Sequence, residues 1–382
     1  MSIKKRIALV LSFLCVFTFL AMPVYAVGGE TIWPTEDFVT GTAPRWLCAP
    51  VLEAAFVYKG ITNGNVFNDS VLVLYKGELV YERYACGWDA DTPHGMYSVT
   101  KSVLSALVGI AIGEGAIGGV TQKVTDFFDD AVIAPGQESK LDMTIEHLLT
   151  QTSGLPGDDD AIANDYPWWE ANASSGEAFD SGKAAFEVPQ TAAPGERFAY
   201  SSGPGMQTLA CLISRAVDRN LFDYAKEKLF GPLGMTSVLW DAAADGNNYG
   251  GFGIFMTPRD MLRLGYLYLH NGEWDGVQII PADYVAATPP PSIAGEDYGY
   301  LFWGTTFVQG DSYQASGSFG NFICVLPEYD AVLVRTGSAG PLTRTVNRAA
   351  YASPVVNFVF MQLILPFLPL KGIPLEYFRA TL

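Results

Sequence analysis

The sequence has few of the groups on which many enzymes and binding proteins depend. It contains only three histidines in 382 residues, and no serine stands in a Gly-x-Ser-x-Gly motif. A serine in that motif normally works with a histidine base, so the α/β-hydrolase arrangement is disfavoured. Lysine and arginine number 23 against 40 aspartates and glutamates, which gives a net charge of −17. Nucleic acids and anionic membranes carry charge of the same sign and are therefore poor partners for this chain.

The chain also lacks an N-terminal apolar run long enough to cross a membrane comfortably. A basic stretch at residues 4–6 precedes an apolar stretch at residues 7–20, and a small-residue segment follows up to Ala26. This order is typical of a secretory signal peptide over residues 1–26, and an uncleaved N-terminal anchor is the alternative. Cleavage after Ala26 would take the net charge to −20. We expect a secreted or periplasmic protein with no stable membrane association after cleavage.

Cysteine is scarce as well. Cleavage would leave Cys48, Cys86, Cys211 and Cys324. An even number permits disulfides in an exported protein, but the wide and irregular spacing resembles neither a disulfide framework nor a zinc site. Buried free thiols are favoured, and disulfide pairing stays open. Neither a metal nor a cofactor is expected.

Strand-like segments lie near both ends of the chain, and helical segments lie between them. Strand patterns occur at residues 71–75, 79–84, 298–307, 321–326 and 331–335. Helical patterns occur at residues 98–112, 144–151, 207–217, 221–230 and 256–269. A further apolar segment at residues 355–370 contains prolines and polar residues, which favours a packed helix over a membrane span.

The economical fold is α/β (α+β), with an antiparallel sheet flanked by helices. The sheet domain is predicted to be built from both termini, over residues 27–95 and 296–382. A mainly helical domain is predicted as an insertion over residues 96–295. Active sites commonly lie in the cleft between two such units.

One pair of residues in this framework points to covalent catalysis. Ser98 opens a helix that is apolar nearly all round, and Lys101 projects from the same face one turn later. A lysine can take the proton of a serine when burial lowers the pKa of its amine. Free N–H groups at a helix start also stabilise developing negative charge. A Ser-x-x-Lys pair alone arises by chance in a chain of this length, so the helical setting is what favours Ser98.

Around this pair the sequence resembles the penicillin-recognising serine hydrolase superfamily. It is nearest the branch that contains class C β-lactamases, carboxylesterases of that fold and 6-aminohexanoate-oligomer hydrolases. The stretches that carry the likeness are residues 96–102 (MYSVTKS), 144–156 (TIEHLLTQTSGLP), 194–202 (PGERFAYSS), 232–235 (PLGM) and 257–261 (TPRDM). The resemblance spans most of the mature chain. It implies a β-lactamase-like fold and an acyl-enzyme formed on Ser98, with Lys101 as base.

The same resemblance implies roles for further residues. Tyr200 matches the tyrosine of a Tyr-x-Asn element and would relay the proton with Lys101, whereas Ser202 stands in the place of the asparagine. The backbone N–H groups of Ser98 and Ser318 would form the oxyanion hole. Three aromatic residues fall where family members line the substrate pocket, although ordinary loop packing explains them equally well: Tyr166, Trp168 and Trp169.

The third motif of the family is incomplete in this chain. The motif is a basic residue, any residue and glycine on a strand beside the site, and its best match here is Ala315, Ser316 and Gly317. Residues 335–337 (Arg-Thr-Gly) contain a cation, but no hairpin follows them, and we interpret them as the end of the next strand. The basic group of penicillin-directed members binds a substrate carboxylate, which Ala315 cannot do. A small-molecule ester or amide without that carboxylate is therefore the favoured substrate.

Three functions follow as alternatives. The first is an exported esterase or amidase, and the second is a peptidoglycan DD-peptidase or β-lactamase with its carboxylate anchor elsewhere. The third is a non-catalytic relative that binds a ligand. The third is disfavoured because Ser98, Lys101 and Tyr200 are all present.

Overall fold

The computed structural model describes residues 31–35, 37–42, 67–85, 87–160, 180–290, 296–305 and 312–338. The predicted signal peptide, the apolar segment at 355–370 and two of the cysteines, Cys48 and Cys86, lie outside these ranges. The three aromatic residues of the predicted substrate pocket also lie outside them: Tyr166, Trp168 and Trp169.

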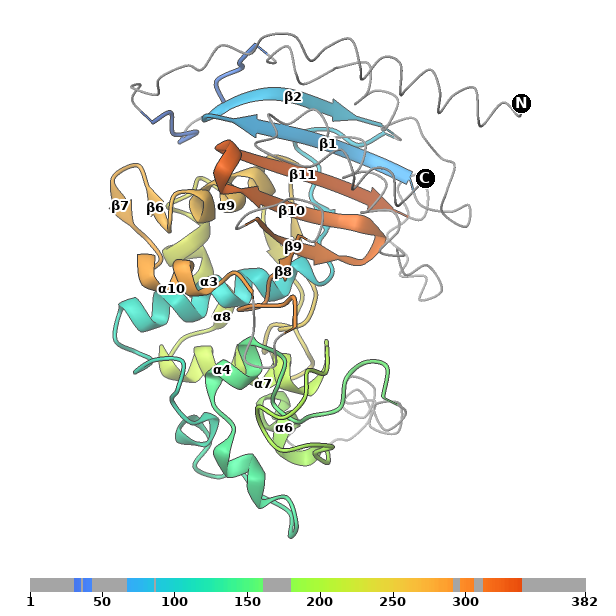
Figure 1. The fold of residues 1–382 in the computed structure, drawn as a ribbon, viewed down its shortest axis with the longest axis vertical. Helices are drawn as coiled ribbons and strands as arrows, with labels where there is room; N and C mark the ends of the chain where they lie inside the picture. The colour runs from blue at the N-terminus through green and yellow to red at the C-terminus, as the bar shows by residue number, and fades with distance from the viewer. Residues whose placement is uncertain are drawn as a thin grey trace, which may run out of the picture.

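A six-stranded sheet combines strands from both ends of the described chain (Figure 1). Its strands are, in spatial order, β2 (Glu78–Tyr84), β1 (Phe67–Tyr75), β11 (Ala331–Ser338), β10 (Asn321–Leu326), β9 (Tyr313–Gly317) and β8 (Trp303–Gly304). Each strand pairs with its neighbour in the antiparallel sense. The predicted α/β (α+β) class with an antiparallel sheet is confirmed, and the domain boundaries stay a prediction.

Turn residues explain why the long strands form hairpins. Lys76 and Gly77 both have positive φ, 52° and 77°, which is the backbone that a two-residue hairpin between twisted strands requires. The β10–β11 hairpin turns through η6 (Pro327–Tyr329) and a left-handed Asp330. Every residue of β10 and β11 is buried, so both faces of these central strands are covered.

The predicted strand at residues 298–307 is wrong over most of its length. Among residues 298–305, the part of this segment that the structure describes, only β8 (Trp303–Gly304) is a strand. Leu301 has a φ of +58°, and the N–H of Gly299 donates to the carbonyl of Phe302 at 2.8 Å. The chain therefore folds back on itself before β8, and the apolar residues that suggested a strand are buried in a turn.

Helix α9 (Pro258–Leu269) packs directly on the sheet. Thr257 caps its first turn and Pro258 occupies its first position, as the sequence predicts. A Cβ on Gly265 would come within 2.5 Å of Val332 Cγ1 and within 2.7 Å of Ile323 Cγ2. Glycine at this position therefore allows the helix to approach β10 and β11 closely.

Helix α3 (Val99–Gly113) lies between the sheet and the helical layer that contains α7 (Pro204–Ala216) (Figure 1). It contacts β9 and β10 on one side and α7 on the other, which explains why it is apolar nearly all round. Burying one such Val, Leu or Ile side chain contributes about 1.5–3 kcal/mol. The start of α3 is thereby fixed at the junction of the two layers.

Shorter elements complete the described part. They are η1 (Val124–Phe127), η2 (Glu138–Asp142), α4 (Ile145–Leu149), η3 (Ser181–Lys183), α6 (Ala184–Glu187), α8 (Leu221–Ala225), η4 (Lys226–Phe230), α10 (Ala282–Ala287) and η5 (Ser318–Gly320). Small sheets join β3 (His94–Gly95), β5 (Ile254–Met256) and β4 (Leu239–Trp240), and β6 (Glu273–Trp274) with β7 (Val277–Gln278). None of the helices described is both long enough and apolar enough to span a membrane.

Two of the four cysteines of the mature chain lie in the described part. Cys211 and Cys324 are buried free thiols, as the sequence predicts. Burial raises the pKa of Cys211 to about 12 and raises the pKa of Cys324 further. Both thiols therefore stay protonated at neutral pH, and neither is an activated nucleophile.

Candidate active site

Ser98 stands at the N-cap of α3, directly after a tight turn. The preceding residue, Tyr97, has a φ of +51°, which is uncommon for a residue with a side chain. Strand β3 leads into this turn, and the N–H of Met96 donates to the carbonyl of Ile254 at 2.8 Å. The turn leaves Ser98 partly exposed, whereas the helix that follows it is buried.

Lys101 lies one turn into the same helix and is only 1% exposed. Its Nζ donates to Ser98 Oγ at 2.9 Å, to Ser202 Oγ at 2.9 Å and to the carbonyl of Gly251 at 3.0 Å. The carbonyl can only accept, but each hydroxyl can accept or donate. A neutral amine can therefore keep its N–H toward Gly251 and turn its lone pair toward the Ser98 hydroxyl. The arrangement suits proton transfer between Ser98 and Lys101.

Tyr200 lies against the same amine. Lys101 Nζ is 4.7 Å from the centre of the Tyr200 ring, a distance at which a cation is attracted to a ring face. The ring itself packs against Trp303 and Tyr298, with centroid distances of 5.4 and 6.0 Å. Ser98, Lys101, Tyr200 and Ser202, predicted from separate parts of the sequence, are thus brought together.

The loop that carries Tyr200 and Ser202 is held by two side chains. The Gln151 amide donates to the carbonyl of Ser201 at 3.1 Å and accepts from the Ser201 N–H at 2.9 Å. Asp158 Oδ1 accepts from the N–H of Ser202 at 2.8 Å, and the Asp158 N–H donates to the carbonyl of Tyr200 at 2.7 Å. These contacts fix the loop before α7 begins.

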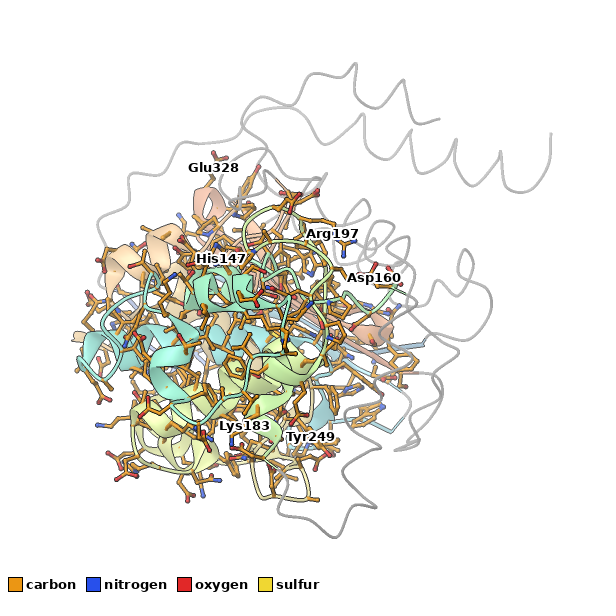
Figure 2. All side chains as sticks on the ribbon, turned by 90° about the horizontal axis from the view of Figure 1, so that it is seen from below. His147, Asp160, Lys183, Arg197, Tyr249 and Glu328 are labelled. Carbon is orange, nitrogen blue, oxygen red and sulfur yellow. The ribbon has the colours of Figure 1, made fainter. Side chains whose placement is uncertain are left out.

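An ion pair ties the outer parts of these two loops. Arg197 Nη2 donates to Asp160 Oδ2 at 2.8 Å, and the two side chains lie next to each other in Figure 2. The hydrogen bond from Arg197 lowers the pKa of Asp160 below its usual value. The Gly157 N–H donates to the same carboxylate at 2.8 Å. The pair is too exposed to contribute much stability, but it joins the segments that carry Asp158 and Tyr200.

Strand β9 ends directly against the start of α3. A Cβ on Gly317 would collide with the carbonyl oxygen of Met96 and would come within 3.2 Å of Ser98 N and 3.3 Å of Val99 N. The N–H of Ser98 therefore lies beside the turn that begins at Ser318, which is the placement that a two-donor oxyanion hole requires. Ala315, two residues earlier in β9, is fully buried and supplies no charge.

Residues 335–337 do not supply the missing cation at this position. They lie within β11, so the interpretation of this segment as part of the next strand is confirmed. Arg335 pairs with Phe322 across the β10–β11 ladder and is 1% exposed.

The three histidines have structural partners of their own. His147, which is labelled in Figure 2, belongs to the capping box of α4 and accepts from the Thr144 N–H at 3.1 Å. His94 Nε2 is 2.9 Å from Asp69 Oδ2, and the His270 ring packs against Tyr266 at 4.3 Å. None of these contacts involves Ser98, which agrees with the absence of a histidine-based motif.

Sequence reasoning missed three residues of the site. Gly251 accepts from Lys101, and Gln151 and Asp158 hold the Tyr200 loop. The signal for the first was the Gly-Gly-Phe-Gly run at residues 250–253, since a Cβ on Gly251 would collide with the carbonyl of Ser202. Gln151 lies in the 144–156 stretch that carries the family resemblance, but no pattern indicates its contact with the Tyr200 loop, and none marks Asp158.

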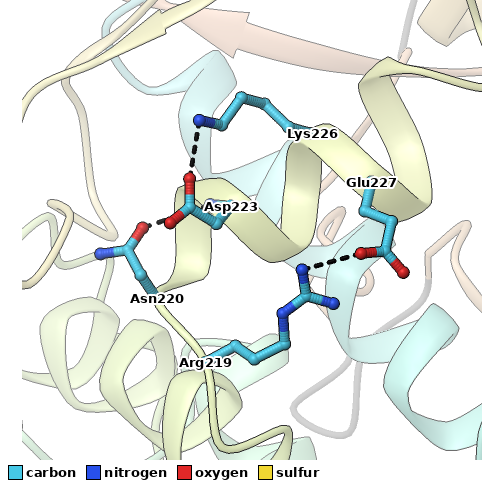
Figure 3. A pocket seen from close by; sticks show the side chains of 5 residues that line it. All are labelled: Arg219, Asn220, Asp223, Lys226 and Glu227. Carbon is cyan, nitrogen blue, oxygen red and sulfur yellow. Dashed lines mark hydrogen bonds and ion pairs between the residues drawn. The ribbon is translucent and has the colours of Figure 1, made fainter.

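A surface depression of about 560 Å³ lies elsewhere, at the turn between α7 and α8 (Figure 3). It is lined by Arg219, Asn220, Asp223, Lys226 and Glu227. Its charges pair with one another, Arg219 with Glu227 at 2.7 Å and Lys226 with Asp223 at 2.6 Å. None of the predicted site residues that the structure describes lines it. In the ranges that the structure describes, no group of three His, Cys, Asp or Glu side chains is placed to hold a metal ion.

Comparison with known proteins is consistent with this geometry. Residues 55–353 match the Beta-lactamase family. A 6-aminohexanoate-dimer hydrolase from Paenarthrobacter ureafaciens is 23% identical over 288 residues, which cover 71% of this chain and 72% of that protein. Among solved structures, a family VIII carboxylesterase aligns with a TM-score of 0.63 at 16% identity, covering 86% of this chain and 99% of the other. The octameric penicillin-binding protein homologue from Pyrococcus abyssi aligns with a TM-score of 0.63 at 20% identity, covering 87% and 81%.

Proposed function

Because the chain belongs to the beta-lactamase family of serine hydrolases, we propose that it cleaves an ester or amide through an acyl-enzyme on Ser98. The observation that carries the proposal is the buried amine of Lys101, 2.9 Å from Ser98 Oγ. A buried cation is costly unless it is paired or functional, and in the described part of the chain this amine donates to two hydroxyls and one carbonyl. The proposal includes export, on the basis of the signal-peptide pattern at residues 1–26.

The proposed reaction assigns one step to each of these groups. The Ser98 hydroxyl attacks the substrate carbonyl carbon and gives its proton to the amine of Lys101. The N–H groups of Ser98 and Ser318 stabilise the negative charge that develops on the carbonyl oxygen. Tyr200 passes a proton to the leaving alcohol or amine as the bond to the acyl carbon breaks. Water then attacks the acyl-enzyme, and proton transfer in the opposite direction releases the acid and restores Ser98.

The lack of a cation at Ala315 on β9 supports a particular class of substrate. A penicillin or a D-Ala-D-Ala terminus carries a free carboxylate, and a cation beside the site would bind it. Ala315 occupies that position here and is fully buried. An ester or amide without this carboxylate is therefore favoured. The names of two relatives, a dimer hydrolase and a carboxylesterase, agree with such chemistry.

Labelling of the mature protein with two reagents tests the proposal. A fluorophosphonate is expected to form one covalent adduct, which peptide mass analysis places on Ser98. Benzylpenicillin is expected to form no lasting adduct and to be hydrolysed far more slowly than p-nitrophenyl butyrate. Absence of any adduct on Ser98 would contradict an acyl-enzyme mechanism and favour a non-catalytic relative. A stable penicillin adduct would instead favour a DD-peptidase.

Gly317→Ala is expected to lower kcat for p-nitrophenyl butyrate by about 100-fold, since a misplacement of about 1 Å at a reacting group can cost this much. The added methyl group would push against the backbone of Met96 and Ser98 and separate the two walls of the site. The measurement is kcat per folded molecule, with folding checked by circular dichroism. Gly118→Ala is the control, because its nearest neighbour is the flexible Gln122 side chain at 3.3 Å. An unchanged kcat in Gly317→Ala would contradict the close approach.

A further inference from the structure

The backbone beside Ser318 is held in an unfavourable conformation. Phe319 and Gly320, the next two residues, have φ values of +62° and +74°. The turn after Gly317 forms one wall of the site, and the turn before Ser98 forms the other. In this second wall, Tyr97 has a φ of +51°. A left-handed conformation is unfavourable for a residue with a side chain and persists only where the surroundings impose it. The structure must therefore contain groups that hold both walls in place.

Arg335 holds the wall that contains Phe319 and Gly320. Its Nη1 donates to the carbonyl of Phe319 at 2.9 Å and to the carbonyl of Gly320 at 2.5 Å. Its Nε donates to Asn68 Oδ1 at 2.7 Å, which fixes the plane of the guanidinium. Burial lowers the pKa of Arg335 to about 10, and the charge of Asp69 opposes this effect. The guanidinium is therefore charged at neutral pH and directs that charge at two backbone carbonyls.

Asn321 connects that wall to the other. It is fully buried, and its Nδ2 donates to the carbonyl of Ser318 at 2.7 Å and to the carbonyl of Gly95 at 3.4 Å. Gly95 lies on the segment that leads to Ser98. Its carbonyl is also 3.2 Å from His94 Nδ1. One side-chain amide thus joins the two segments whose N–H groups would bind the oxyanion.

Together these two side chains hold three consecutive carbonyl groups, those of Ser318, Phe319 and Gly320. A peptide group is planar, so fixing a carbonyl also fixes the N–H on the next residue. Because these three carbonyl groups are held, the backbone of Ser318, which begins the turn, has little freedom to rotate. Contact between the Tyr97 and Phe319 rings, with centroids 5.1 Å apart, links the walls a second time.

We infer that Asn321 and Arg335 form an oxyanion clamp, a buried pair of positioning residues that fixes the N–H groups of Ser98 and Ser318 relative to each other. The inference rests on the proposed acyl-enzyme function and extends it to residues that do not contact the substrate. Donors of an oxyanion hole act through their placement before the reaction begins. The clamp therefore stabilises the tetrahedral state and has little effect on substrate binding.

The test compares Arg335→Met, Arg335→Lys and Asn321→Ala with the unaltered protein. Each variant is assayed with p-nitrophenyl butyrate, with active sites counted by fluorophosphonate titration. Phenylboronic acid serves as a second probe, because its tetrahedral serine adduct places an oxygen in the oxyanion hole. Arg335→Met is expected to lower kcat by about 100-fold, with KM unchanged, since one lost oxyanion donor costs on the order of 10²–10³. The inhibition constant of phenylboronic acid should rise in parallel.

A matched control separates positioning from stability. Lys140 is also a buried cation that donates to two backbone carbonyls, those of Phe186 at 2.8 Å and Val188 at 2.6 Å. Lys140→Met is expected to leave kcat per active site unchanged. Arg335→Lys should recover part of the lost rate, because an ammonium group can still donate to the Phe319 and Gly320 carbonyls.

Three results would overturn the clamp: an unchanged kcat in Arg335→Met, a loss confined to KM, or an equal loss in Lys140→Met. If Arg335→Met does not fold, Asn321→Ala is expected to show the same loss of kcat and decides by the same criteria. An unaltered protein that neither hydrolyses the ester nor reacts with the fluorophosphonate would overturn the proposed function itself, which is a distinct result.

Discussion

Ser98→Ala is expected to abolish hydrolysis of p-nitrophenyl butyrate, lowering kcat by on the order of 10⁶, as loss of a serine nucleophile does in other serine hydrolases. Two hydroxyls lie 2.9 Å from the amine of Lys101, those of Ser98 and Ser202. Only the position of Ser98 combines this amine with backbone donors at a helix start and at the turn after Gly317. The N–H of Ser202 donates to Asp158 Oδ1 at 2.8 Å and is not available to an oxyanion, so Ser202 is not expected to replace Ser98.

The measurement for Ser98→Ala is steady-state kinetics together with fluorophosphonate labelling. Labelling should disappear in Ser98→Ala and persist, more slowly, in Ser202→Ala. Ser105→Ala is the matched control, because this serine lies on the same buried helix and its hydroxyl is 3.0 Å from that of Tyr284. Its loss should cost about 1 kcal/mol of stability and leave kcat unchanged. A labelled Ser98→Ala protein would show that another residue is the nucleophile.

Much of the fold is readable from the sequence because its signals are local. The Lys-Gly turn between β1 and β2, the apolar helix after Ser98 and the capping box at Thr257 each depend on residues a few positions apart. The predicted strand at 298–307 is wrong because that prediction also used only a local pattern, the run of apolar residues. Its apolar residues are buried, but the left-handed Leu301 reverses the chain, and leucine is not a residue type that indicates a positive φ.

The residues of the candidate site also differ in whether their partners are near or distant in the sequence. Ser98 and Lys101 lie three residues apart on one helix and can be inferred from physical reasoning, whereas Tyr200 came from the family resemblance. Gly251 joins the site through a contact across 150 positions, and Gln151 through contacts across 50. Such contacts are set by how the loops pack, which the local sequence pattern does not specify.

The clamp residues illustrate a further limit. Arg335 attracts attention in the sequence only as a cation followed by Thr-Gly, a pattern that suggests a substrate-binding residue. In the structure its guanidinium points at the carbonyls of Phe319 and Gly320 instead. The sequence correctly placed this segment in the next strand, but the sequence alone does not reveal which neighbours a buried strand residue contacts.

Lys101→Met is expected to lower kcat by about 10⁴-fold, the upper range for loss of a general base, while the protein stays folded. Methionine fills nearly the same volume but has no basic nitrogen, so the Ser98 hydroxyl keeps its proton when it meets the substrate. The folded state should tolerate the change. A buried cation costs desolvation energy, and exchanging it for an apolar side chain of similar size is often neutral or stabilising. The Gly251 carbonyl would lose one donor, and the two hydroxyls can rotate toward each other or toward water.

The decisive comparison for Lys101 is therefore between activity and stability in one variant. Tm should be unchanged or higher in Lys101→Met, as measured by thermal unfolding, while the burst of p-nitrophenol and the steady-state rate both fall. Loss of activity at constant or increased stability is the signature of a residue kept for catalysis at the expense of the fold. Lys140→Met supplies the contrast, since its amine lies buried against carbonyls outside the site and its loss should not affect kcat. Undiminished turnover in Lys101→Met would exclude Lys101 as the base and would direct attention to Tyr200, whose ring lies 4.7 Å from the same nitrogen.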